Sequence, residues 1–353
     1  MITEDGSPPE ATPAGSARPG DAPAPTDRSS LACSDSTGRG DAKFRRLVLF
    51  GAFDRHNFGD LLLAHCAVAR YRGREPVFAG LAARDLTAFG GHRVEALAEV
   101  LEVLGHEPVD LVHVGGELLT TTAWEAAVML QTPADAATAI AAYDRNPKAR
   151  RDWAAGTLRS DRLVPYVVDH GLLPSGSTAR FDTVGGVALD ALAPAERAEV
   201  FLALKSAASV SVRDRATADA LRQSGIHADL VPDPAAATAA LFRDAIAARA
   251  RTGEVAALSA RMPDWIALQL AADRGDDATL DRLARALAAT PGEHGIVLFR
   301  AGLAPWHDDR DTLDRLSRPA GRNLRVGSPA RHLCAARRRA RLSRHQPARL
   351  DRR

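Results

Sequence analysis

One arginine in this sequence stands where a parallel sheet presents its ligand-binding residues. The segment Ala207–Val212, which ends as a short β-branched strand, leads directly into Arg213 and Asp214, and the next apolar segment ends at Asp233-Pro234. Open α/β sheets bind ligands at the carboxyl ends of their strands, where a guanidinium holds phosphate or carboxylate through two parallel hydrogen bonds. We therefore expect Arg213 to bind an anion, with a structural ion pair to Asp214 or Asp233 as the alternative. Asp233 also suits the cap of a helix that begins at Pro234.

The turn Asn57-Phe58-Gly59-Asp60 is a second candidate. It follows the apolar segment Leu47–Phe50 and opens a helical pattern. Glycine lets a ligand approach the main chain, and the free N–H groups of a helix N-terminus attract an anion. Asn57 or Asp60 is equally suited to capping that helix. The sequence leaves both roles open.

A third candidate turn, Gly115-Gly116-Glu117, follows the apolar segment Leu111–Val114. A pair of glycines there permits a ligand or a facing segment to come close to the backbone. The alternative is an ordinary turn from a strand into a helix.

The segment His307-Asp308-Asp309 lies between a strand pattern and a helix pattern. An imidazole exchanges protons near neutral pH, so His307 suits a proton donor or acceptor. Asp308 or Asp309 equally suits a helix N-cap. Three scattered cysteines, with no Cys-x-x-Cys or His-Glu-x-x-His motif, predict neither a disulfide framework nor a metal site.

The elements that position these residues alternate between short apolar strands and amphipathic helices. The predicted strands are Leu47–Phe50, Pro76–Phe78, Leu111–Val114, Leu163–Val168, Thr183–Val187, Val210–Val212 and Asp229–Val231. The predicted helices are Gly59–Arg70, Arg93–Leu104, Pro194–Ser206, Arg215–Ser224 and Pro234–Ala248. This alternation predicts a mostly parallel sheet with helices on both faces.

Between about Phe44 and about Leu333 these motifs together resemble the polysaccharide pyruvyl transferase family, although Val114 stands where the family usually has a first of three glycines. The resemblance implies transfer of a pyruvyl group from phosphoenolpyruvate to two hydroxyls of a sugar or glycan, as in exopolysaccharide and cell-envelope biosynthesis. The products are a cyclic ketal and phosphate, and no cofactor is implied. By resemblance, the catalytic residues are His307 and Asp308, and the substrate-binding residues are Asn57, Gly59, Asp60, Gly115, Gly116, Glu117, Arg213, Asp214 and Asp233.

A second alternation follows the break in apolar rhythm at Arg249–Pro263. It predicts strands at Ile266–Leu270, Gly295–Arg300 and Leu324–Val326, with helices at Ala278–Ala289 and Asp311–Leu316. We therefore expect an α/β fold of two Rossmann-like domains, residues 44–250 and 251–333, in a glycosyltransferase-B-like (GT-B-like) arrangement. With about three strands, the second domain is expected to be truncated.

The family's Gly-Thr-Ser-x-His-Gly element, whose histidine is a candidate catalytic acid, does not appear in frame. One permitted codon spelling of His345–Arg353, read one nucleotide later, encodes Thr-Ser-Leu-His-Gly-Ser-Ile-Val. We therefore expect a frameshift near Ala335–Arg337, with residues 334–353 as an out-of-frame basic tail. Such a chain is expected to be inactive.

Composition adds the remaining expectations. Residues 1–43 are rich in Pro, Ala, Gly, Ser and Asp, which predicts a disordered leader. The net charge is +2, of which the segment from Arg331 to the end contributes +8, leaving −6 for residues 1–330. No apolar run approaches the roughly 18 residues of a membrane span, so we expect a cytoplasmic protein.

Three other functions compete with pyruvyl transfer. A sugar-nucleotide glycosyltransferase would have a similar two-domain shape. A non-catalytic remnant or binding protein would follow from the truncation. Nucleic-acid binding through the arginine-rich tail would depend steeply on salt, and we rank it last and expect no specific nucleic-acid partner. The oligomeric state and the acceptor sugar are not determined by the sequence.

Overall fold

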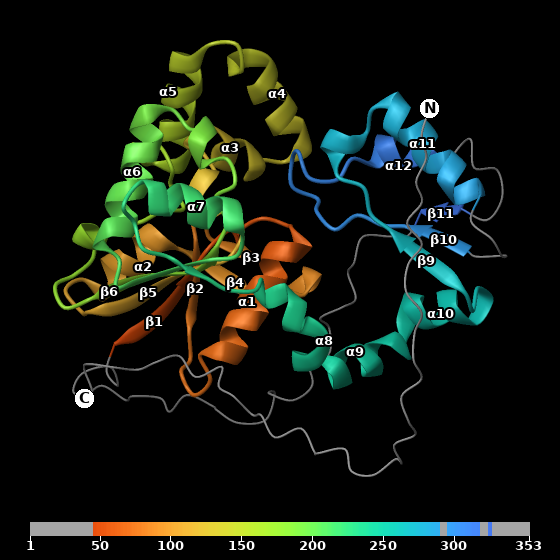
Figure 1. Ribbon diagram of the computed structural model, residues 1–353, viewed down its shortest axis with the longest axis horizontal. Helices are drawn as coiled ribbons and strands as arrows, with labels where there is room; N and C mark the ends of the chain where they lie inside the picture. The colour runs from red at the N-terminus through yellow and green to blue at the C-terminus, as the bar shows by residue number, and fades with distance from the viewer. Residues whose placement is uncertain (1–44, 290–294, 318–323, 327–353) are drawn as a thin grey trace, which may run out of the picture. The chain divides into compact units, whose positions relative to one another are not determined.

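The computed structural model describes residues 45–289, 295–317 and 324–326 (Figure 1). The predicted leader 1–43 and basic tail 334–353 lie outside these residues, as does the proposed frame change near Ala335. Within the described ranges, no helix combines the length and the apolar composition that a membrane span requires.

The described residues contain a Rossmann-like α/β fold built on an eight-stranded sheet. Its strands lie in the order β3-β4-β2-β1-β5-β6-β7-β8, and every neighbouring pair is parallel except β3 with β4. The bounds are β1 Arg46–Phe50, β2 Val77–Gly80, β3 Arg84–Asp85, β4 Arg93–Ala96, β5 Val109–Val114, β6 Thr178–Val184, β7 Ser209–Val212 and β8 Asp229–Leu230.

Helices cover both faces of this sheet. Alternate residues of a strand point to opposite faces, so each strand contributes side chains to two separate cores. In the central strand β1, Val48 and Phe50 belong to a core that includes residues of α2, α6 and α7. Leu47 and Leu49 belong to a different core with α1. A strand buried on both sides must be apolar throughout, which explains the unbroken run of β1 and confirms the predicted parallel sheet.

Several of the helices that accompany the sheet begin at a side-chain cap. Asn57 caps α1, Thr132 caps α4 ahead of Pro133, and Asp214 caps α7. The bounds are α1 Phe58–Arg70, α2 Leu97–Leu104, α3 Ala123–Met129, α4 Pro133–Tyr143, α5 Pro147–Leu158, α6 Pro194–Ser206, α7 Arg215–Gln223, α8 Thr238–Leu241, α9 Arg243–Ala250 and α10 Gly253–Arg261. Helices α3, α4 and α5 contact one another and are inserted between β5 and β6.

A second, three-stranded parallel sheet has the order β11-β10-β9. Its strands are β9 Trp265–Leu268, β10 Gly295–Leu298 and β11 Leu324–Val326, and its helices are α11 Asp277–Ala288 and α12 Arg310–Ser317. Leu280, Leu298, Leu313 and Leu316 form its core. These elements confirm the second strand–helix alternation read from the sequence.

Three of the predicted elements differ from the structure, and the predicted link contains a helix. The segment predicted as one helix, Arg93–Leu104, is strand β4 followed by α2, because Glu95 and Ala96 pair with β2. The predicted strand Thr183–Val187 is in fact the end of β6 and a glycine turn. The predicted helix Pro234–Ala248 is a 3₁₀ turn followed by α8 and α9, and α10 occupies much of the expected link Arg249–Pro263.

The predicted strand Leu163–Val168 is a buried loop. The Glu199 carboxylate accepts hydrogen bonds from the main-chain N–H groups of Leu163 and Val164, at 3.0 and 3.2 Å. The N–H of Val168 donates to His113 Nε2 at 3.0 Å. The apolar run therefore marked burial correctly, while side chains replace the strand neighbours that the backbone would otherwise need.

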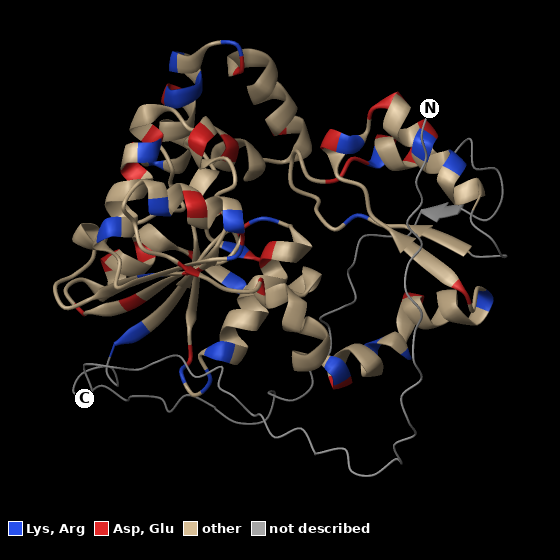
Figure 2. Ribbon diagram, in the orientation of Figure 1, with Lys and Arg blue, Asp and Glu red and all other residues tan. Residues whose placement is uncertain are grey.

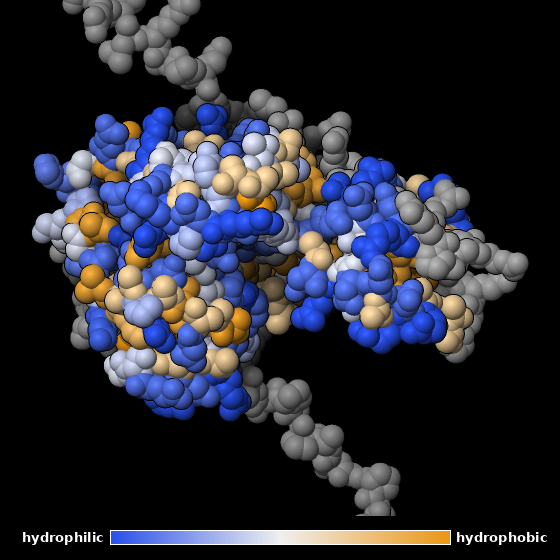
Figure 3. All heavy atoms as spheres, turned by 90° about the horizontal axis from the view of Figure 1, so that it is seen from above, coloured by the Kyte–Doolittle hydropathy of each residue, from blue (hydrophilic) through white to orange (hydrophobic). Residues whose placement is uncertain are grey.

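Acidic and basic side chains are interspersed over the helices, and strands β1, β2 and β7 contain few charged residues (Figure 2). On the face shown in Figure 3, hydrophilic residues predominate and hydrophobic ones form small patches. This distribution is typical of solvated helix faces around an apolar sheet.

A buried polar network closes the carboxyl end of β1. The Tyr166 hydroxyl donates to Asp54 Oδ1 at 2.8 Å, and Asp54 Oδ2 accepts from the N–H groups of Leu81 and Ala82 at 2.6 and 3.2 Å. Both side chains are at most 1% exposed. Burial raises the pKa of Asp54, against the lowering effect of Arg55 and of these hydrogen bonds. The network ties the loop after β1 to the end of β2.

We predict that Tyr166→Phe lowers the free energy of unfolding by about 1–3 kcal/mol, because the buried Asp54 carboxylate loses one donor. Urea unfolding followed by circular dichroism measures the change. Tyr143→Phe, a half-buried tyrosine in a separate cluster with Trp124 and Trp153, serves as the control and should cost much less. Equal losses in both variants would contradict the proposed importance of the Asp54 hydrogen bond.

Candidate functional site

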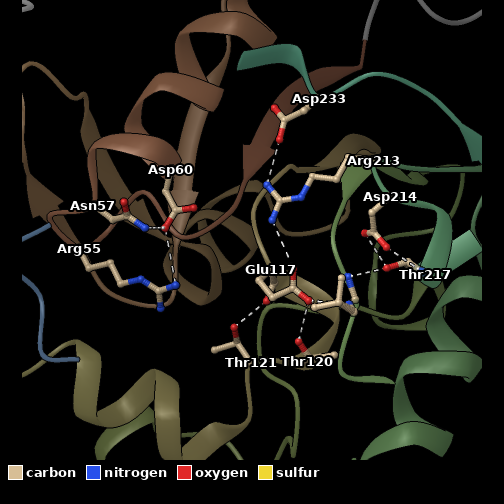
Figure 4. Close-up of polar contacts among 12 residues, drawn as sticks. Arg55, Asn57, Asp60, Glu117, Thr120, Thr121, Arg213, Asp214, Thr217 and Asp233 are labelled. Carbon is tan, nitrogen blue, oxygen red and sulfur yellow. Dashed lines mark hydrogen bonds and ion pairs between the residues drawn. The ribbon is translucent and has the colours of Figure 1, made fainter. Parts of the chain in front are cut away.

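The structure brings most of the predicted site residues to one edge of the eight-stranded sheet. Asp60 follows β1, Glu117 follows β5, Arg213 follows β7 and Asp233 follows β8. Parallel strands present their carboxyl ends at the same edge, so these four side chains meet although they are far apart in the sequence (Figure 4).

Arg213 lies between two carboxylates. Its Nη1 is 3.2 Å from Asp233 Oδ2, and its Nη2 is 3.3 Å from Glu117 Oε2. Glu117 Oε1 also accepts from the N–H of Val187 at 2.8 Å and from Thr120 Oγ1 at 3.2 Å. The structural alternative considered for Arg213 is therefore observed with Asp233, and Glu117 is an additional partner that the sequence did not suggest.

Asp214 and Asp233 both act as helix caps. Asp214 accepts from Thr217 N and Thr217 Oγ1, each at 2.7 Å, at the start of α7. Asp233 Oδ1 accepts from Ala235 N at 2.8 Å while its Oδ2 faces Arg213. Of these two aspartates, only Asp233 pairs with Arg213.

The turn after β1 combines capping with a buried acid. Asn57 Oδ1 accepts from Gly59 N at 3.1 Å, and Asn57 Nδ2 donates to Asp60 Oδ2 at 2.9 Å. Asp60 is buried, and its Oδ2 is 3.7 Å from Arg55 Nη2. Burial raises the pKa of Asp60, while Arg55 and then Asn57 and Arg213 lower it.

Glycines allow the loops of the site to touch. Gly115 and Gly116 have positive φ values of 49° and 72°, which favour glycine. A Cβ at Gly116 would lie 2.9 Å from Asp60 Oδ1. A Cβ at Gly185 would collide with Glu117 Oε2, so Gly185 is a further requirement of the site. The sequence analysis missed it because Thr183–Val187 was predicted as a continuous strand.

Arg55 is the principal residue that the sequence analysis missed. It is 8% exposed, and its guanidinium carbon lies 5.4 Å from the centre of the Tyr166 ring. Among the described residues, its Nε and Nη1 have no hydrogen-bond partner. Burial opposes its charge, but Tyr166, Asp60 and Asp54 raise its pKa. The signal in the sequence is a polar run, Asp54-Arg55-His56, which begins four residues after the last residue of the buried strand β1.

His307 lies in a loop that is hydrogen-bonded to the turn after β1. Phe58 N donates to Ala301 O at 2.8 Å, and Leu303 N donates to His56 O at 2.9 Å. The Nε2 of His307 is buried without a partner in the described part of the chain. Burial, and next the charge of Arg55, lowers the pKa of His307 to about 4.

The other acids of this loop hold the backbone. Asp308 Oδ2 accepts from the N–H groups of Ala301 and Gly302, and its Oδ1 accepts from Gln269 Nε2 at 2.7 Å. Asp309 accepts from Thr312 N at 3.0 Å at the start of α12. The predicted N-cap alternative therefore applies to Asp309, and the predicted catalytic residue Asp308 shapes the loop that carries His307.

Comparisons with known proteins leave the family open. No protein-family model matches the chain, and a search of curated proteins finds no significant match. No group of three or more His, Cys, Asp or Glu side chains suited to a metal ion occurs in the residues described. The candidate site is thus defined by its own geometry. It contains Arg55 and Arg213, the carboxylates of Asp60, Glu117 and Asp233, and His307, whose pKa is lowered.

We predict that the His307 imidazole is neutral at pH 7 and takes up a proton only near pH 4. Because the unfolded chain binds this proton first, the stability that His307 contributes is complete above about pH 6.5 and is lost as the pH falls toward 4. NMR titration of the imidazole in wild type and in Arg55→Gln measures the effect.

In Arg55→Gln the pKa of His307 should rise but stay below its ordinary value, because burial is the larger cause. The control is Arg74→Gln, since Arg74 pairs with Asp110 and the main-chain oxygen of Arg45. A pKa of His307 that does not differ between wild type and Arg55→Gln would contradict the influence of Arg55.

Proposed function

We propose that this protein binds phosphoenolpyruvate at the carboxyl edge of the eight-stranded sheet and belongs functionally with the pyruvyl transferases. The proposal is supported chiefly by Arg213, which stands beyond the end of β7 where the resemblance expects the anion-binding residue. Arg55, from the loop after β1, adds a second guanidinium beside Asp60. Two cations from separate strands suit a donor that carries both a phosphate and a carboxylate.

An incoming anion exchanges places with a carboxylate that already holds Arg213. The side chains of Arg213, Glu117 and Asp233 are 26%, 37% and 37% exposed. Ion pairs as exposed as these are weak, at about 0–1 kcal/mol each, so their exchange for a phosphate costs little. Glu117 keeps its bonds to Val187 N and Thr120 when it releases Arg213, which leaves the loop in place.

In the proposed reaction, a proton adds to the methylene carbon of phosphoenolpyruvate and makes C2 electrophilic. A sugar hydroxyl then forms a bond to C2, and the bond from C2 to the phosphate oxygen breaks as phosphate leaves. The second hydroxyl completes the ketal. The two hydroxyls together release two protons, of which one restores the general acid and the other departs with phosphate. Neutral His307 is the group proposed to accept a hydroxyl proton, and Asp308 holds its loop.

We predict that Arg213→Lys lowers the affinity for phosphoenolpyruvate about tenfold, because a lysine keeps the charge but loses the planar fork. Arg213→Ala should weaken binding further. Isothermal titration calorimetry with the full chain measures both, with Arg222→Lys as the control because Arg222 pairs with Asp219 on the exposed face of α7. Normal binding in both Arg213 variants would make Arg213 only a structural partner of Glu117 and Asp233.

The proposal includes the GT-B-like pairing of two domains and the frame change near Ala335. We predict that the 353-residue chain forms no ketal, whereas a chain restored by a one-base shift after Ala335 releases phosphate from phosphoenolpyruvate in the presence of acceptor. The nucleotide sequence provides the first check, since the family's element must be readable one base over. Ketal formation by the unaltered chain would remove the frame change from the proposal.

The glycosyltransferase alternative makes a different prediction. A nucleotide sugar would then compete for the site that Arg213 marks, and phosphoenolpyruvate would not. Competition between the two ligands in the same calorimetric assay separates these functions.

A further inference from the structure

Arg55 carries hydrogen-bond donors that the described chain leaves unused. Its side chain is only 7% exposed, yet neither Nε nor Nη1 has a partner among the described residues. A buried charged group without hydrogen bonds is costly, and native proteins satisfy nearly all such groups. An arginine kept in this condition at the carboxyl edge of a parallel sheet has the properties of a ligand-binding residue.

The surrounding residues hold the guanidinium in place without using those donors. The ring of Tyr166 lies 5.4 Å from the guanidinium carbon, and the Tyr166 hydroxyl is fixed by Asp54. Asp60 approaches only Nη2, at 3.7 Å, which is longer than a hydrogen bond. Arg55 is therefore oriented from one side by an aromatic ring, and its charge is only partly balanced.

The nearby charges favour a carboxylate over a phosphate at Arg55. Asp60 Oδ2 lies 3.7 Å from Arg55 Nη2, and the charge of Arg213 also lowers the pKa of Asp60. A phosphate dianion placed against Arg55 would face the buried Asp60 carboxylate, whereas a carboxylate carries half that charge. Arg213, which is more exposed and flanked by carboxylates that can be exchanged, suits the phosphate.

We propose that Arg55 binds the carboxylate group of a small-molecule ligand through one of its unused donors, Nε–H or Nη1–H. The inference rests on the proposed function for the identity of that ligand, phosphoenolpyruvate, and assigns its carboxylate to Arg55 and its phosphate to Arg213. The unpartnered Nε2 of His307 lies in the loop that is hydrogen-bonded to the same turn, and the assignment places the carboxylate end of the ligand toward that loop.

The test compares three probes on the full chain: phosphoenolpyruvate, pyruvate and inorganic phosphate. Affinities are measured by calorimetry for wild type, Arg55→Gln, Arg55→Lys and the control Arg74→Lys, whose arginine pairs with Asp110 away from this turn. Arg55→Gln should lower the affinity for pyruvate and for phosphoenolpyruvate about tenfold or more, and should leave the affinity for inorganic phosphate unchanged. Circular dichroism verifies that each variant folds. If Arg55→Gln does not fold, the affinities of Arg55→Lys, which keeps the charge, test the carboxylate assignment.

Each outcome bears on one proposal or the other. Unchanged pyruvate affinity in the Arg55 variants, or an equal loss of phosphate affinity, overturns the carboxylate assignment. If phosphoenolpyruvate binds and the Arg55 variants bind it normally, the assignment fails while the proposed function stands. If wild type binds pyruvate through Arg55 but does not bind phosphoenolpyruvate, the assignment stands and the proposed function fails. If wild type binds none of the probes, both fail.

Discussion

The Asp54 carboxylate lies wholly inside the protein and accepts hydrogen bonds from Tyr166, Leu81 and Ala82. These bonds offset the cost of burying a polar group and fix the course of the loop after β1. Tyr166, held by Asp54, supplies the ring against which Arg55 lies. The position of the buried guanidinium, and so of the charge beside Asp60 and His307, depends on this one carboxylate.

The same edge of the sheet contains two arginines in different electrostatic settings. Arg213 is partly exposed and bridges Glu117 and Asp233, so its partners can be exchanged. Arg55 is buried, oriented by Tyr166 and short of hydrogen-bond acceptors. The proposed ligand, phosphoenolpyruvate, would account for both settings: the exposed Arg213 would exchange a carboxylate partner for the phosphate, and the buried Arg55 would receive the less charged carboxylate.

The close packing of the loops explains why the site needs several glycines. Gly116 lies against Asp60, and Gly185 lies against Glu117 and Arg213. A side chain at either position would separate residues that must touch across neighbouring strands. The turns therefore serve the approach of one loop to another.

The sequence by itself determined the parallel α/β fold, the order of most strands and helices, and the positions of Asp60, Glu117, Arg213 and Asp233 at strand ends. These features follow from local patterns: apolar runs, helical periodicity and the residues that end a strand. It did not determine β4, because Arg93–Ala96 becomes a strand only by pairing with β2. Only the tertiary structure decided which acid Arg213 would pair with, since Asp214 turns to cap α7 while Glu117 arrives from another strand. Only the tertiary structure likewise showed that Arg55 is buried and that its Nε and Nη1 have no hydrogen-bond partner among the described residues, because burial depends on residues as distant in the sequence as Tyr166.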